Sequence, residues 1–106
     1  MATGILGTAD LTATTNTTVY TVPADTFAVV TVSVCNRSTT NRSVRIAIAD
    51  ADTPTSAEFI EYDSAILGNG VLERTGIVMN AGKKLVIRAD SIDVTAMVYG
   101  IETSTA

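Results

Sequence analysis

Residues 26–35 read Thr-Phe-Ala-Val-Val-Thr-Val-Ser-Val-Cys, and this stretch decides the fold. The even-numbered residues from Ala28 to Val34 are all apolar and fall on one face of an extended chain, whereas Thr31 and Ser33 fall on the other. An alternation of this kind, with a period of two residues, is typical of a β-strand. We therefore predict a long central strand whose even-numbered face is buried.

Short runs of β-branched residues recur along the rest of the chain at intervals of about ten residues, and Gly, Asn, Asp or Pro separates them. Residues 43–49 alternate like residues 26–35 and follow a polar stretch, so we predict that these two segments form a hairpin. Further strands are predicted near residues 19–22, 71–78, 84–88 and 92–101.

The segment from Thr55 to Gly68 allows two interpretations. Thr55 and Glu58 have the spacing of a helix-capping box, and Gly68 could end a helix. Residues 59–63, Phe-Ile-Glu-Tyr-Asp, are instead rich in strand-forming residues. We favour the strand.

The chain of 106 residues has the length of one domain. The pattern predicts an all-β fold: a single antiparallel β-sandwich or jelly-roll-like domain of about eight strands. We assign residues 1–15 to an N-terminal arm or edge strand, residues 16–102 to the sandwich, and residues 103–106 to a polar tail.

The residue types argue against an enzyme. The chain has no His, which removes the commonest general base and metal ligand, and its single cysteine, Cys35, cannot form an internal disulfide. The net charge is −4 and the seven basic residues are scattered, so we expect no nucleic-acid partner. No apolar run reaches the length of a membrane helix, and the first residues lack the basic and apolar pattern of a secretory signal, so we expect neither. We predict no catalytic residues, no cofactor-binding residues and no metal ligands.

One alternative is a small carbohydrate- or calcium-binding module. Acidic side chains gather between Asp50 and Asp63, and oxygen ligands suit calcium, although the spacing is not that of an EF-hand. Exposed aromatic side chains beside this segment would favour that alternative, and Phe59 and Tyr62 are the only ones near.

Several segments together resemble small structural proteins of tailed bacteriophages, and the resemblance covers most of the chain. It rests on Tyr-Thr-Val-Pro-Ala at 20–24, a Val-rich strand ending in Cys-Asn-Arg at 35–37, Gly-Val-Leu-Glu-Arg at 70–74, and Ala-Gly-Lys-Lys-Leu at 81–85. The resemblance implies a β-sandwich and a non-enzymatic structural role in the virion, which assembles in the host cytoplasm. Capsid decoration, as a cement protein on the assembled head, is the first expectation, and a tail, baseplate or fibre role is the alternative.

On this interpretation the partners are the major capsid protein or tail proteins, and the chain forms a homo-oligomer, for which a trimer on a local symmetry axis is one arrangement. An assembly protein needs a contact surface. The candidates are Ile5 and Leu6 in the N-terminal arm, and Phe27 and Val29 on the second face of the central strand.

Overall fold

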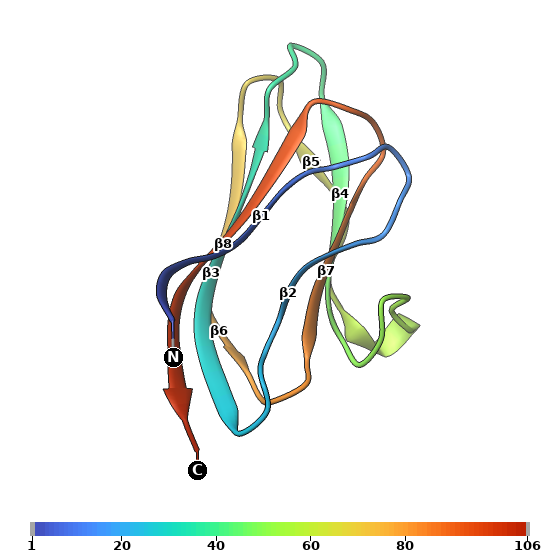
Figure 1. Cartoon of the computed structure of the whole chain (residues 1–106). Helices are drawn as coiled ribbons and strands as arrows, with labels where there is room; N and C mark the ends of the chain where they lie inside the picture. The colour runs from blue at the N-terminus through green and yellow to red at the C-terminus, as the bar shows by residue number, and fades with distance from the viewer. Residues whose placement is uncertain (1, 106) are drawn as a thin grey trace.

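The computed structural model describes residues 2–105, which form eight strands and one short 3-10 turn (Figure 1). In chain order the elements are β1 (Thr3–Asp10), β2 (Thr17–Thr21), β3 (Thr26–Asn36), β4 (Arg42–Ala49), the 3-10 turn (Ser56–Glu58), β5 (Phe59–Ile66), β6 (Val71–Met79), β7 (Lys84–Ala89) and β8 (Val94–Ser104).

The strands form two four-stranded sheets that face each other across one hydrophobic core. Sheet A has the strand order β1-β8-β3-β6, and sheet B has the order β2-β7-β4-β5. All pairs of neighbouring strands are antiparallel. The prediction of an all-β, antiparallel sandwich of about eight strands is confirmed.

The pairing follows a nested pattern, because the first strand pairs with the last, the second with the seventh, the third with the sixth, and the fourth with the fifth. This is the wrap of a jelly roll, in which one long folded-over ribbon is rolled into two sheets. Only β4 and β5 are consecutive strands that pair with each other. The predicted hairpin between residues 26–35 and 43–49 is therefore wrong, since β3 lies in sheet A and β4 in sheet B.

The alternation in β3 is confirmed, because Ala28, Val30, Val32 and Val34 are all fully or almost fully buried. The sheet on the other side of the core contributes apolar residues of β4 and β7. Burying such side chains stabilises the fold by roughly 1.5 to 3 kcal/mol each before entropy is counted. The second face of β3 remains partly exposed.

Within residues 55–68, Phe59–Ile66 form the strand β5, as we predicted. The capping box between Thr55 and Glu58, which the helical interpretation suggested, is also present. Glu58 accepts a hydrogen bond from the backbone N–H of Thr55 at 2.8 Å. The helix ends after a single 3-10 turn, because the β-branched and aromatic residues that follow pair with β4 as β5.

Each edge strand carries an irregularity. The registers of the β1–β8, β2–β7, β3–β6 and β4–β5 pairs all contain a shift, whereas the two inner pairs, β3–β8 and β4–β7, run without one. A bulge twists an edge strand and hinders pairing with another chain. The regular ladders therefore lie inside the sheets, and the irregular ones lie at the edges.

The two ends of the described chain lie close together (Figure 1). β1 is an edge strand that pairs along its length with β8. Within the segment assigned to a polar tail, Thr103 and Ser104 pair with Phe27 and Thr26 as the last residues of β8, and residue 106 lies outside the described part. No helix among residues 2–105 is long and apolar enough to cross a membrane.

Candidate functional site

The outer face of sheet A carries an apolar row across three adjacent strands. Ile101 of β8 lies directly opposite Val29 of β3, and Val29 lies directly opposite Val78 of β6. Directly opposed residues of antiparallel strands point to the same side of a sheet. Ile101 and Val78 are 49% and 68% exposed. We call these three residues the apolar row.

Further apolar side chains extend this face. Phe27 precedes Val29 by two residues and is partly exposed on the same side of β3. Tyr99 precedes Ile101 by two residues and is partly exposed on the same side of β8. Ile5 lies opposite Tyr99 and is 65% exposed. The structure thus places three of the four predicted contact residues, Ile5, Phe27 and Val29, on one face. Leu6 instead packs against the core.

A polar contact also crosses this face. The hydroxyl of Tyr99 donates a hydrogen bond to Oε2 of Glu73 at 3.1 Å, which joins β8 to β6 over the intervening β3. This hydrogen bond raises the pKa of Tyr99 above its usual value. The apolar face therefore has a polar boundary on one side of the apolar row.

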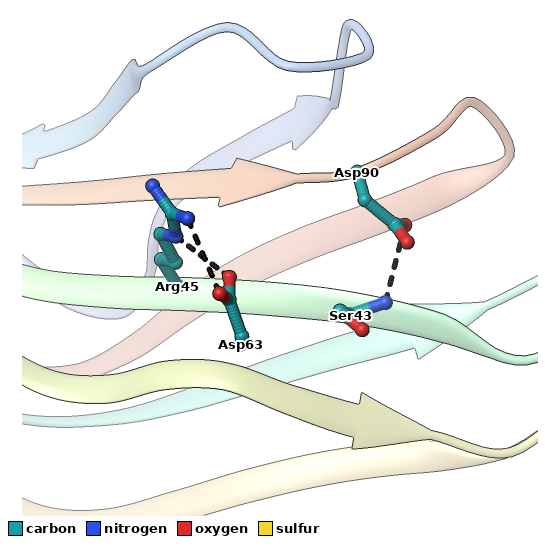
Figure 2. Close-up of polar contacts among 4 residues, drawn as sticks. All are labelled: Ser43, Arg45, Asp63 and Asp90. Carbon is teal, nitrogen blue, oxygen red and sulfur yellow. Dashed lines mark hydrogen bonds and ion pairs between the residues drawn. The ribbon is translucent and has the colours of Figure 1, made fainter.

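The outer face of sheet B differs, because charged residues surround an open pocket of about 350 Å³. Arg45 of β4 lies in this pocket, and Asp63 of β5 holds it through two hydrogen bonds, Nε to Oδ1 at 2.7 Å and Nη2 to Oδ2 at 3.2 Å (Figure 2). Such bidentate pairs are among the stronger ionic contacts in proteins. The hydrogen bond from Arg45 lowers the pKa of Asp63.

A bulge in β5 aims Asp63 at Arg45. The register passes from Ser64 to Glu61 between neighbouring ladder positions, and Asp63 has a φ of +52°, in the left-handed region. Tyr62, beside it in the bulge, lies under the Arg45 guanidinium, whose Cζ is 4.1 Å from the ring centroid. Arg45 is therefore fixed from two sides, by a carboxylate and by an aromatic ring.

The opposite wall of the pocket is built from backbone contacts. Oδ1 of Asp90 accepts a hydrogen bond from the backbone N–H of Ser43 at 3.1 Å (Figure 2), and the N–H of Asp90 donates to the carbonyl of Ser43 at 3.0 Å. Thr14 closes the pocket from the β1–β2 loop, where its N–H donates to the carbonyl of Ala89 at 2.8 Å.

Arg88 completes the pocket and lies directly opposite Arg45 in the β4–β7 ladder. Its side chain is partly buried. Among the residues that the structure describes, Arg88 has no hydrogen bond and no ion pair. Of the two opposed arginines, Arg45 is hydrogen-bonded to Asp63, whereas Arg88 interacts with the charge of Asp63 without a hydrogen bond.

The acidic residues between Asp50 and Asp63 do not converge. Each one contacts a different group, and within residues 2–105 no cluster of three or more potential metal-binding residues exists. The partners are Lys83 for Asp50, Thr18 and Lys84 for Asp52, the backbone N–H groups of Thr55 and Asp50 for Glu58, Arg74 and Ser64 for Glu61, and Arg45 for Asp63.

The two packed antiparallel sheets place the chain in the class of β-sandwich domains. A family model described as the fourth Ig-like domain of Trs120/TRAPPC9 matches residues 6–100. The chain belongs to this family of Ig-like domains. Neither a curated protein nor a solved structure gives a significant match.

This assignment corrects the predictions that rested on resemblance to bacteriophage structural proteins. The match to the Trs120/TRAPPC9 domain overturns the virion role, both as a capsid decoration protein and as a tail, baseplate or fibre protein. It also overturns the capsid and tail partners, the homo-oligomer on the virion, and the location in a virion. The alternative of a carbohydrate- or calcium-binding module is wrong for the same reason. The short segments behind the resemblance mark turns and strand ends, which sandwiches of many families share.

The strand order of this chain is a separate finding. Immunoglobulin domains of the constant type place strands A, B, E and D in one sheet, so their first and second strands pair. Here the first strand pairs with the eighth and the second with the seventh. The likeness to Ig domains therefore lies in the sandwich architecture, and the connections between strands follow the jelly-roll wrap.

The sequence did not indicate two features of these surfaces. Val78 and Ile101 join Val29 only through the register of three strands that are distant in sequence. Arg45 and Arg88 likewise meet only through the β4–β7 ladder. An outward position in a predicted strand was the only available signal for each residue, and it does not specify the neighbour across the sheet.

Proposed function

We propose that the chain is a non-catalytic protein-binding domain that docks through the outer face of sheet A. The family assignment supports a place in a Trs120/TRAPPC9-type protein, and thus a partner among the subunits of the TRAPP vesicle-tethering complex. The observation that carries the docking surface is the apolar row of Ile101, Val29 and Val78, which crosses three strands without a charged residue.

The distribution of bulges supports contact through a face. All four edge strands carry register shifts, which disfavour the addition of a strand from another protein. The outer face of sheet A instead offers apolar side chains on the two inner strands, β3 and β8, and on the adjoining edge strand β6. Contiguous exposed apolar surface of this kind is typical of protein contact sites.

The proposal is tested with the double variant Val78→Glu, Ile101→Glu. Both side chains are largely exposed, so the substitutions leave the core intact, but each would bury a charge in a complex. The matched control is Ile92→Glu, which is 58% exposed in the loop between β7 and β8.

The 106-residue chain and its variants are incubated with purified TRAPP subunits, and binding is measured by biolayer interferometry. We expect the double variant to bind at least about tenfold more weakly, while the control binds like the unchanged chain. Equal binding by all three proteins would contradict the docking surface. Absence of binding by the unchanged chain to every subunit would contradict the partner class.

A further inference from the structure

We propose that the pocket on sheet B binds a carboxylate through Arg88, and that this carboxylate is the side chain of an Asp or Glu in an acidic polypeptide segment. This inference does not depend on the docking surface of sheet A, which lies on the other side of the sandwich. It starts from the pair of opposed arginines, Arg45 and Arg88.

Like charges that lie directly opposite each other in a sheet repel and destabilise it. Arg45 is compensated by the bidentate contact with Asp63, and its guanidinium also covers Tyr62. Arg88 has no such contact among residues 2–105, although it is partly buried and borders the same pocket. The pocket is therefore lined by a guanidinium, a group with five N–H donors, that makes no hydrogen bond to the described residues.

The other walls of the pocket narrow the choice of ligand. Two carboxylates, Asp63 and Asp90, line it, so a doubly charged anion such as phosphate meets repulsion there. A singly charged carboxylate meets less repulsion and matches the planar fork of a guanidinium. The contact between Arg45 and Asp63 is an example of that geometry in the same pocket.

The surroundings of the pocket suit a carboxylate that belongs to the side chain of a polypeptide. The pocket opens on the outer face of sheet B, between the β1–β2 loop at Thr14 and the bulge at Asp63. The hydroxyl of Ser43 also lines it and has no hydrogen bond among the described residues, so it is open to a backbone group of a bound segment. Tyr62, 59% exposed, adjoins Asp63 and adds an apolar contact for a neighbouring side chain.

The test is an NMR titration of the 106-residue chain with sodium acetate, at ionic strength kept constant with sodium chloride. We expect acetate to shift the backbone amide signals of Ser43, Arg88 and Ala89, with saturation. Arg88→Gln should weaken acetate binding at least about tenfold, and Arg88→Lys should weaken it as well, because lysine lacks the bidentate fork. Lys84→Gln, on the same strand and the same face, is the control and should bind like the unchanged chain.

Two further titrations separate the possible sources of the anion. The peptide Gly-Gly-Glu-Gly-Gly, with blocked ends, should bind more tightly than acetate, and its Gln counterpart should not shift the three signals. Tighter binding of inorganic phosphate than of acetate, or acetate shifts that persist in Arg88→Gln, would overturn the carboxylate site. A glutamate peptide that binds no better than acetate would overturn the polypeptide source.

Discussion

The side-chain amide of Asn36 donates a hydrogen bond to the carbonyl oxygen of Ile66 at 3.1 Å, and thereby joins the end of β3 in sheet A to the end of β5 in sheet B. The same amide also donates to the carbonyl oxygens of Thr40 and Leu67, and its Oδ1 accepts from the N–H and the hydroxyl of Ser38. Asn36 is completely buried. One side chain thus fixes two loops at one end of the sandwich.

We expect Asn36→Ala to lower the free energy of unfolding by about 3 kcal/mol, because it removes the partner of the buried Ile66 carbonyl and of the part-buried groups of Thr40, Leu67 and Ser38. Urea unfolding followed by circular dichroism measures the loss. The control is Asn41→Ala, since Asn41 is exposed and accepts one hydrogen bond, from the N–H of Gly68 at 3.1 Å. A loss no larger than that of the control would show that the two loops hold without Asn36.

The central strand provides a test of register. Val32 is completely buried, so Val32→Asp places an unpaired charge in the core, and we expect the chain to lose its cooperative fold. The adjacent Thr31 lies on the outer face, and Thr31→Asp should cost only about 1 kcal/mol. Thermal unfolding of both variants, with soluble yield, measures the difference. A cooperative thermal transition in Val32→Asp would contradict the register of β3.

The contact between Tyr20 and Glu102 predicts a dependence of stability on pH. The Tyr20 hydroxyl donates to Oε2 of Glu102, and this hydrogen bond, together with one from the N–H of Ala2, lowers the pKa of Glu102. A glutamate in the unfolded chain titrates near pH 4.3, roughly. Its contribution to stability is therefore complete above that pH and is lost as the pH falls through the lower, folded-state pKa.

We expect Tyr20→Phe to be less stable than the unchanged chain at pH 7, with a gap that narrows below about pH 4.3. Burial, and then the contact with Glu102, raises the pKa of Tyr20, so the unchanged chain should also lose stability above about pH 10. The variant should lose less there, because only Tyr99, whose pKa is also raised, remains of the two tyrosines. Urea unfolding from pH 3 to pH 11 measures both changes. A gap that stays constant over this range would show that the pair contributes nothing through ionisation.

Substitutions at two glycines, Gly100 and Gly76, should destabilise the fold for different reasons: a steric clash at the first and backbone strain at the second. A Cβ at position 100 would lie 2.1 Å from the carbonyl oxygen of Val29, so Gly100→Ala forces β8 and β3 apart and should cost about 3 kcal/mol. A Cβ at position 76 has no atom within 4 Å, but the φ of +68° disfavours alanine, so Gly76→Ala should cost about 1 kcal/mol. Urea unfolding measures the free energy of unfolding of the two variants, and we expect the larger loss for Gly100→Ala. Equal losses would contradict the close approach of β3 and β8 at Gly100.

The sequence predicted the strands better than their partners. The alternation in residues 26–35 defined both faces of β3, because burial of one face dictates a period of two residues. It did not identify β6 and β8 as neighbours, since alternation carries no information about which strand lies alongside. The wrong hairpin between β3 and β4 arose from that gap, because the loop that joins them crosses from one sheet to the other.

The candidate surfaces were predicted only in part. Phe27 and Val29 were recognisable because they are apolar residues on the second face of a strand whose first face is already buried. In the sequence, Arg45 and Arg88 look like ordinary charged residues on the outer faces of two strands. Their neighbours in the sequence do not indicate that the two strands pair and place these arginines opposite each other. Whether Ile5, Phe27 and Val29 contact a partner stays a prediction.

The pairing of the first strand with the last sets a condition on synthesis of the protein. Thr3 lies opposite Ile101, so the ladder that completes sheet A needs residues separated by almost the whole domain. Contacts of such long sequence separation make folding slow, because the chain must close large loops before the contacts form. While the ribosome is still making β8, β3 lacks one neighbour and β1 lacks its only one. The strands of sheet B all precede β8, so sheet A is the part of the sandwich that stays incomplete, with apolar surface uncovered, until β8 has left the exit tunnel.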